Sequence, residues 1–174
     1  MHSKNENKKV LLDCDVIRHL IKGDKIALLY ELYGNNLVIL KVVFDELFRS
    51  TQIQNVVENF IKLFKIEIMD FPADNIDILK EYANLRKRFG DGESACMAVA
   101  KYQEDIIASS NLKDVKKYCE KNGIHYITTM DILLEAVDFG KMSESECDII
   151  IQKIINKKSK LPVDNLADYR KMKR

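Results

Sequence analysis

The sequence lacks the features that a membrane-anchored, disulfide-stabilised or zinc-binding protein requires. No apolar run in its 174 residues approaches the roughly 18 residues of a membrane span. The polar stretch 1–9 has no apolar core like that of a signal peptide, so we expect a cytoplasmic protein without a membrane partner. The four cysteines form no Cys-x-x-Cys pair and the three histidines lie far apart. This spacing predicts reduced, buried thiols rather than disulfides or a zinc site.

A strong excess of one charge is also missing. The chain has 28 Lys and Arg against 27 Asp and Glu, a net charge of +1, so its overall field does not indicate a nucleic-acid partner. The stretch 157–174 is an exception, with seven basic residues against two acidic ones. This basic tail is interpreted equally well as a solvated segment or as a binding surface.

Short apolar runs alternate with helical patterns along the whole chain. The apolar runs predict strands at 10–12, 37–40, 66–69, 105–109 and 124–127. The stretches between and after them predict helices at 16–21, 25–33, 43–49, 52–64, 72–88, 93–100, 111–121, 130–139, 144–156 and 164–172. Such alternation is typical of an α/β fold with a parallel sheet. We expect a flexible N-terminal segment at 1–9, one core domain at 10–140, and a C-terminal helical extension with the basic tail at 141–174.

Acidic residues lie where the predicted strands end or the next helices begin. Asp13 and Asp15 follow the first strand, and Glu46 lies in the helix after the second. Glu93 opens the helix before the fourth strand, and Asp114 comes shortly after that strand. We expect these acids at one edge, because the carboxyl ends of parallel strands share an edge. Gathered carboxylates repel one another, and Mg²⁺ or Mn²⁺ removes that cost and can activate a water molecule beside a phosphoryl group.

Each acid can also be read structurally. Asp15 and Asp114 can serve helix caps, Glu46 can lie on a solvated helix face, and Glu93 can interact with the positive end of its own helix. The position of Asp13 alone favours a functional role, because an acid at the end of a core strand costs free energy unless its charge serves a function. The shared edge is what strengthens the functional interpretation of the whole set.

Three motifs in order resemble the PIN-domain nucleases, and within them the VapC-type toxins. Residues 10–17 read Val-Leu-Leu-Asp-Cys-Asp-Val-Ile, similar to the family's apolar strand followed by an acid. Residues 42–47 read Val-Val-Phe-Asp-Glu-Leu, similar to its Val-x-x-x-Glu-Leu motif. Residues 90–100 begin Gly-Asp-Gly-Glu and continue as a helix of small residues, as in one PIN subgroup. The stretch 123–129 also resembles a late strand of that subgroup. The resemblance covers nearly the whole chain, from residue 10 to about residue 171.

The resemblance implies a three-layer α/β/α PIN-like fold with a five-stranded parallel sheet of order 3-2-1-4-5 and extra C-terminal helices. It implies that Asp13, Glu46 and Glu93 bind Mg²⁺ or Mn²⁺, with Asp15 in support. The implied activity is metal-dependent hydrolysis of RNA phosphodiester bonds by the toxin of a toxin–antitoxin pair. The implied partners are an RNA substrate, an antitoxin protein and a second copy of the chain, since family members often form homodimers.

The sequence departs from the family pattern after the fourth strand. The family usually has an acid close to that strand end, whereas residues 109–114 here read Ser-Ser-Asn-Leu-Lys-Asp. Asn111 is the nearest match to the missing acid, and Asp114 can supply a carboxylate one turn later. We expect these two residues, with Ser109 and Ser110, to orient water or RNA. The departure leaves open a catalytically degenerate PIN-like protein that binds RNA or a partner without cutting.

A lesser alternative is a haloacid-dehalogenase-like phosphatase, in which Asp13 and Asp15 would form the Asp-x-Asp start and Asp13 would be the nucleophile. The stretch Gly-Asp-Gly at 90–92 resembles a later motif of those phosphatases. That motif should follow an apolar strand, whereas the basic stretch 86–88 precedes it here.

Overall fold

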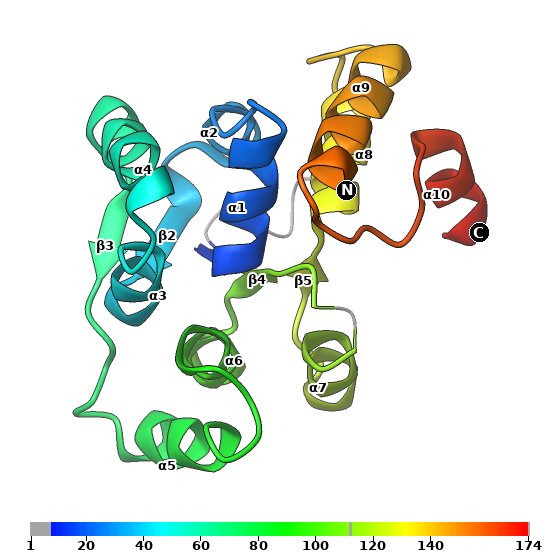
Figure 1. Cartoon of the computed structure of the whole chain (residues 1–174). Coiled ribbons are helices and arrows are strands. Elements are labelled where there is room, and N and C mark those ends of the chain that lie inside the picture. The colour runs from blue at the N-terminus through cyan, green and yellow to red at the C-terminus, as the bar shows by residue number, and fades with distance from the viewer. Residues whose placement is uncertain (1–7, 112, 174) are drawn as a thin grey trace.

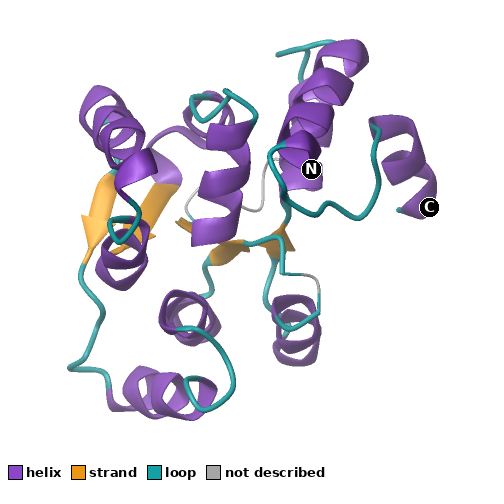
Figure 2. Ribbon diagram, in the orientation of Figure 1, coloured by secondary structure: helices purple, strands orange, loops and turns teal. Residues whose placement is uncertain are grey.

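The computed structural model describes residues 8–111 and 113–173, and within them a five-stranded parallel sheet lies between two layers of helices (Figure 1). Figure 2 shows the strands as a central layer with helices on both sides. The sheet order is β3-β2-β1-β4-β5. The strands are β1 (Val10–Leu12), β2 (Leu37–Leu40), β3 (Glu67–Met69), β4 (Ile106–Ala108) and β5 (Tyr126–Ile127). The predicted α/β fold class and strand order 3-2-1-4-5 are therefore confirmed.

Two groups of helices cover the sheet (Figure 1). On one face lie α5 (Ile76–Leu85), α6 (Asp91–Gln103) and α7 (Val115–Asn122), and α6 packs directly on β1, β2 and β4. On the other face lie α1 (Cys14–Lys22), α2 (Leu28–Tyr33), α8 (Thr129–Asp138) and α9 (Glu144–Asn156). The remaining helices are a 3₁₀ turn (Gly34–Asn36), α3 (Lys41–Leu47), α4 (Thr51–Phe64) and α10 (Leu166–Met172).

Central strands and α6 form the middle of the core. Every residue of β1, β2 and β4 is buried, as continuous apolar runs in a doubly covered parallel sheet should be. The buried residues of α6 run without interruption from Ser94 to Ala100 and are mostly small. Small side chains let this helix lie close to the sheet, which brings its first turn near the strand ends.

The C-terminal helices contribute to the same core. Buried residues of α9 and α10, including Ile151 and Tyr169, belong to one hydrophobic cluster with the central strands. Gly23, after α1, lies so close to α9 that a Cβ atom added there would stand 2.7 Å from Ile150 Cγ2. The four cysteines are free and buried, as predicted.

Several predicted element boundaries were wrong, and two of the differences have a local reason. The helix predicted from Pro72 begins at Ile76, because the Asn75 side chain accepts hydrogen bonds from the amides of Asp77 and Ile78 and so caps it there. The helix predicted from Asn111 begins at Val115. The first helix begins at residue 14 rather than 16, because the residue before it is already its N-cap.

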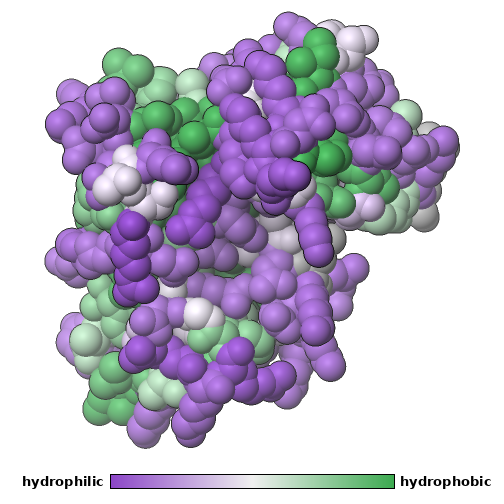
Figure 3. All heavy atoms as spheres, in the orientation of Figure 1, coloured by the Kyte–Doolittle hydropathy of each residue, from purple (hydrophilic) through white to green (hydrophobic). Residues whose placement is uncertain are grey.

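The surface and the chain ends add three observations. Residues 1–7 of the predicted flexible N-terminal segment lie outside the described residues, and the Lys9 amide donates to Asp105 Oδ1 at 3.2 Å. Hydrophilic residues cover most of the face seen in Figure 3. Among the described residues, the helices are too short or too polar for any of them to cross a membrane.

Candidate active site

The site is built where β1 and β4 end side by side. The two strands pair in parallel with Leu12 opposite Ala108, so the next residues, Asp13 and Ser109, emerge together. The Asp13 amide donates to the Ala108 carbonyl at 3.0 Å, and the Ser109 hydroxyl donates to Asp13 Oδ2 at 3.0 Å. The register of two core strands therefore fixes this acid beside a hydroxyl at the sheet edge.

Asp13 is buried, with 6% of its surface exposed, and is the N-cap of α1. Its Oδ1 accepts the Cys14 amide at 2.8 Å. It therefore combines the capping role that the sequence had offered for Asp15 with a position at the strand end.

Asp15 faces the loop after β4. Its Oδ2 accepts the Ser110 amide at 2.8 Å and the Ser109 hydroxyl at 3.4 Å, while its buried Oδ1 has no hydrogen-bond partner within the described chain. A buried carboxylate oxygen without a donor is unusual, because such groups are normally paired. This oxygen is free to accept from water or to approach a cation.

Glu46 reaches the same region from α3. A Cβ atom added to Gly92, at the start of α6, would lie 3.0 Å from Glu46 Oε2 and 3.1 Å from Val43 Cγ2. The first turn of α6 thus leaves room for the Glu46 carboxylate only because residue 92 is glycine.

Glu93 comes from the next position of α6 and contacts the loop after β4. Its Oε1 accepts the Asn111 Nδ2 group at 2.7 Å. The Asn111 Oδ1 atom in turn accepts the Asp114 amide at 3.3 Å, and Asp114 is the N-cap residue of α7 without a side-chain capping bond. The amide at position 111 therefore bonds directly to one of the predicted ligands.

We call Asp13, Asp15, Glu46 and Glu93 the acidic edge. Burial and the charge of Asp15 raise the pKa of Asp13 to about 7. Burial, opposed by hydrogen bonds and reinforced by the charge of Glu93, raises the pKa of Asp15 to about 6. Burial and the charges of Asp13, Asp114 and Glu46 raise the pKa of Glu93 to about 7. These carboxyls lie close enough to disfavour one another's ionised form.

The donor set of the acidic edge suits a hard divalent cation. It offers carboxylate oxygens, one of them buried without a partner, and their mutual repulsion is the cost that such a cation removes. Within residues 8–111 and 113–173, no three acidic, histidine or cysteine side chains are already close enough to hold an ion. The carboxylates would therefore have to draw together around a cation.

Comparison with known proteins decides the family. A family model, DUF3368, described as a PIN domain, matches residues 9–170. The chain belongs to the PIN-domain family. No curated protein matches it.

One solved structure shows the shared fold. This PIN domain superposes on a chain of DNA-bound VapBC from Salmonella typhimurium with a TM-score of 0.55 and 18% sequence identity, covering 70% of this chain and 98% of that chain. The phosphatase alternative is wrong. Asp13 and Asp15, which suggested it, lie in a chain that matches the PIN-domain family model. The Gly-Asp-Gly stretch that resembles a later phosphatase motif forms the start of α6, after helix α5 rather than after a strand.

The structure adds residues to this PIN domain's site that the sequence interpretation missed. The Ser110 hydroxyl bonds to Thr129 Oγ1 at 2.7 Å, and Thr129 Oγ1 lies 3.0 Å from His19 Nδ1. Burial and the charge of Lys22 lower the pKa of His19 to about 4, so this histidine is neutral near pH 7. The sequence showed only a Thr-Thr pair after the fifth strand, with nothing to connect it to the first helix.

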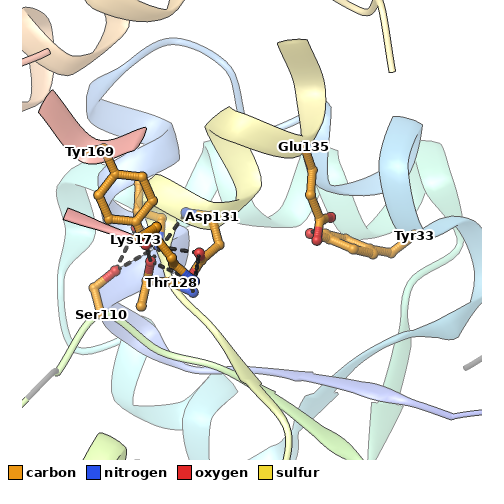
Figure 4. A network of polar contacts seen from close by, with 8 residues as sticks. Tyr33, Ser110, Thr128, Asp131, Glu135, Tyr169 and Lys173 are labelled. Atoms are coloured by element: carbon orange, nitrogen blue, oxygen red, sulfur yellow. Dashed lines mark hydrogen bonds and ion pairs between the residues drawn. The ribbon is translucent and has the colours of Figure 1, made fainter. Parts of the chain in front are cut away.

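A second buried acid in the PIN domain is fully paired (Figure 4). Asp131 Oδ2 accepts the Thr128 amide at 2.9 Å and its hydroxyl at 2.7 Å, while Oδ1 accepts the Tyr169 hydroxyl at 2.8 Å and Lys173 Nζ at 2.6 Å. Burial acts to raise the pKa of Asp131, but the bonds from Lys173 and Thr128 outweigh it and lower that pKa. We call these four residues the Asp131 network.

Proposed function

We propose that this PIN domain is a metal-dependent ribonuclease, an enzyme that hydrolyses RNA phosphodiester bonds. The observation that carries the proposal is the acidic edge itself, where three buried or half-buried carboxyls have raised pKa values at the end of β1 and β4. Asp131, in contrast, has both carboxylate oxygens paired and a lysine beside it. Perturbed acids gathered at a sheet edge favour chemistry.

Asp13, Glu46 and Glu93 would hold Mg²⁺ or Mn²⁺. The bound ion would supply an activated water and neutralise the charge that develops on the phosphoryl group. Asp15, held by Ser109 and the Ser110 amide, would accept hydrogen bonds from water around the ion through its unpaired Oδ1.

Asn111 and Asp114 would position water or RNA beside Glu93. The Asn111 amide already donates to Glu93, so it keeps that carboxylate oriented without adding negative charge. Asp114 adds negative charge nearby, since its charge raises the pKa of Glu93. The site therefore has three candidate metal ligands, and at the position of the family's usual fourth acid it has the neutral Asn111, with Asp114 nearby.

We further propose that the protein is the toxin of a toxin–antitoxin pair, acts in the cytoplasm, and forms a homodimer that an antitoxin binds. The shared fold with a chain of VapBC supports this proposal. Induced expression in a bacterial host should slow growth, whereas the Asp13→Asn variant should not. Equal growth of the two cultures would contradict the toxin role but not the nuclease activity.

A binding-only protein is the second candidate. Asn111 stands where the family usually has an acid, and the three candidate ligands are not yet arranged around an ion. Such a protein would bind RNA or a partner at the same edge without cutting.

Cleavage of a mixed RNA pool tests the proposal. Purified protein is incubated with Mn²⁺, with Mg²⁺ or with a chelator, and the Asp13→Asn variant is purified in parallel to expose contaminating nuclease. We expect metal-dependent cutting of RNA that the variant loses. Folded wild-type protein that binds RNA but leaves it intact with either metal would support the binding-only candidate instead, and cutting of single-stranded DNA alone would contradict the RNA substrate.

A further inference from the structure

A groove between α5 and α7 lies beside the acidic edge and is not explained by it. Its volume is about 330 Å³, and its lining includes Arg88, Lys113, Lys117 and Lys121. In Figure 1 the two helices lie on the same face of the sheet, with α7 beside α6 and α5 beyond α6, farther from the strands. Four basic side chains thus converge on one hollow in a protein whose net charge is only +1.

The internal contacts of the basic residues in the groove are weak: the Arg88 guanidinium lies 5.1 Å from the centroid of the Phe89 ring, and Lys121 interacts electrostatically with Glu81. Within the described ranges, none of the four forms an ion pair or a side-chain hydrogen bond, in contrast to Lys116, which lies 3.9 Å from Glu120. The acids Glu81 and Asp114 also line the groove, and the Glu81 carboxylate is bound by Lys101 at 3.0 Å and by the Tyr118 hydroxyl at 2.7 Å. The four cations outnumber the two acids, so the groove presents a net positive charge to an anionic ligand.

On both walls of the groove, the lining residues are close in sequence to residues of the candidate active site. On one wall, Arg88 and Phe89 immediately precede the first turn of α6, which carries Glu93. On the other wall, Lys113 and Asp114 follow Asn111. Glu93 and Asn111 are themselves joined by a hydrogen bond of 2.7 Å, so the two walls meet at a candidate ligand.

We propose that the α5–α7 groove binds the single-stranded RNA backbone next to the scissile phosphate, an inference that rests on the proposed ribonuclease function. The spacing of Lys113, Lys117 and Lys121 is four residues, which places successive cations along one side of α7 and its N-terminal approach. Phe89 and Tyr118 line the same groove, and the Arg88 guanidinium lies over the Phe89 ring, so aromatic rings and cations stand side by side there. Cations interleaved with aromatic rings are the usual means of holding a single strand without reading its sequence.

Two adjacent lysines of α7 provide a matched test. Lys117 lines the groove, whereas Lys116 does not and pairs with Glu120 on the exposed surface. Lys117→Glu and Lys116→Glu change the net charge equally, and each alters an exposed side chain. A general charge effect on RNA binding would weaken both variants alike, whereas the groove predicts a difference.

The measurement is fluorescence anisotropy of a labelled mixed-sequence RNA of about 12 nucleotides, within the range of known single-strand site sizes. The full chain is used in the Asp13→Asn background, so that no cutting intervenes. We expect Lys117→Glu to weaken binding about fivefold or more and to reduce the slope of log affinity against log salt by about 0.7, the value of one lost single-strand phosphate contact. Lys116→Glu should stay within about twofold, and Lys117→Gln should fall between them.

The outcomes separate this inference from the proposed function. Equal RNA affinities of Lys117→Glu and Lys116→Glu would overturn the proposal that the groove binds RNA, even if wild-type protein cuts RNA. A selective loss with Lys117→Glu would support the groove, even if wild-type protein does not cut. Failure of the Asp13→Asn protein to bind the RNA at low salt would overturn the groove, and selective binding of an acidic peptide to the same face would then identify a protein partner.

Discussion

The acidic edge and the Asp131 network place buried carboxyls in opposite electrostatic situations. In the Asp131 network, each oxygen of one acid accepts hydrogen bonds, and a lysine balances its charge, so its pKa is lowered. At the acidic edge, burial and the charges of neighbouring acids raise the pKa values of Asp13 and Glu93 to about 7. The same fold thus contains one acid that stabilises it and several that it must hold against repulsion.

This difference separates a structural acid from candidate functional ones. Asp131 joins the start of α8 to α10 and completes a capping box with Thr128. Asp13 and Asp15 gain some hydrogen bonds, but burial and neighbouring charges outweigh them. A divalent cation would reverse the balance at the acidic edge and leave the Asp131 network unchanged.

Glu93→Gln should produce the largest effect, a loss of RNA cleavage of about a hundredfold or more, the scale on which loss of one charge-stabilising group lowers catalysis. Glutamine can still accept the Asn111 hydrogen bond, so the geometry should persist without the charge. Asp91→Asn, two residues earlier on the same helix, breaks only an exposed ion pair with Arg86 and is the matched control. Initial rates at saturating Mn²⁺ check the prediction, and equal losses in the two variants would contradict it.

Asp131→Asn should lower the free energy of unfolding by about 1–3 kcal/mol, because it leaves the buried Tyr169 hydroxyl and the Lys173 ammonium with a weaker acceptor. Asp13→Asn should not, because it removes a carboxylate whose ionised form is disfavoured. Asp138→Asn, which breaks an exposed ion pair between the same two helices, is the control. Urea titrations followed by circular dichroism measure all three. Destabilisation by Asp13→Asn as large as that by Asp131→Asn would remove the distinction between the two regions.

The pH dependence of stability should also differ between the two regions. For an acid with a raised folded pKa, the folded state holds more protons than the unfolded state between about pH 4 and the folded value. Without metal, stability should therefore fall as the pH rises from about 4 to about 7, and it should level off above the folded values of Asp13 and Glu93. The lowered pKa of Asp131 acts oppositely, since its contribution is complete above about pH 4 and is lost on acidification.

Added Mn²⁺ should sharpen that profile. The ion binds ionised carboxylates, so it should raise the melting temperature clearly at pH 7.5 and little at pH 5, where Asp13 and Glu93 are mostly protonated. The shift should be reduced in Asp13→Asn and retained in Asp131→Asn. Thermal melts at both pH values measure it, and an equal shift at both would contradict binding at the acidic edge.

Much of the fold could be predicted because its signals are local. The runs 10–12 and 37–40 are apolar at every position and were placed to the residue, and glycine at position 34 ends α2 with a positive φ of 54°. Boundaries failed where a side chain sets the helix start, as Asn75 does for α5. Such capping depends on which of several polar residues adopts the extended backbone, and the sequence does not say which one does.

Part of the candidate site could be predicted from the sequence for a similar reason. Strand ends in a parallel sheet share an edge, so Asp13, Glu93 and Asn111 could be grouped from the alternation and the family resemblance. Thr129 contacts His19, which is 110 residues away, and Ser110, which follows a different strand, and no spacing rule predicts these contacts. The burial of the C-terminal helices in the common core depends on such long-range packing too.

Gly92→Ala tests how finely the acidic edge is positioned, and it should have the smallest effect. The new methyl group would stand 3.0 Å from Glu46 Oε2 and 3.1 Å from Val43 Cγ2, so α3 and α6 must separate by a few tenths of an ångström or the carboxylate must turn away. Alanine favours helix, by about 1 kcal/mol relative to glycine, so overall stability should change little. We therefore expect cleavage at limiting Mn²⁺ to fall by about tenfold, the scale seen when the support of a metal ligand is disturbed, with partial recovery at high Mn²⁺. Gly90→Ala, where an added Cβ meets no atom within 4 Å, is the control. If Gly92→Ala required no more Mn²⁺ than that control, Glu46 would not be a ligand held in place by this close approach. Of the three candidate ligands, only Asp13 and Glu93 would then remain.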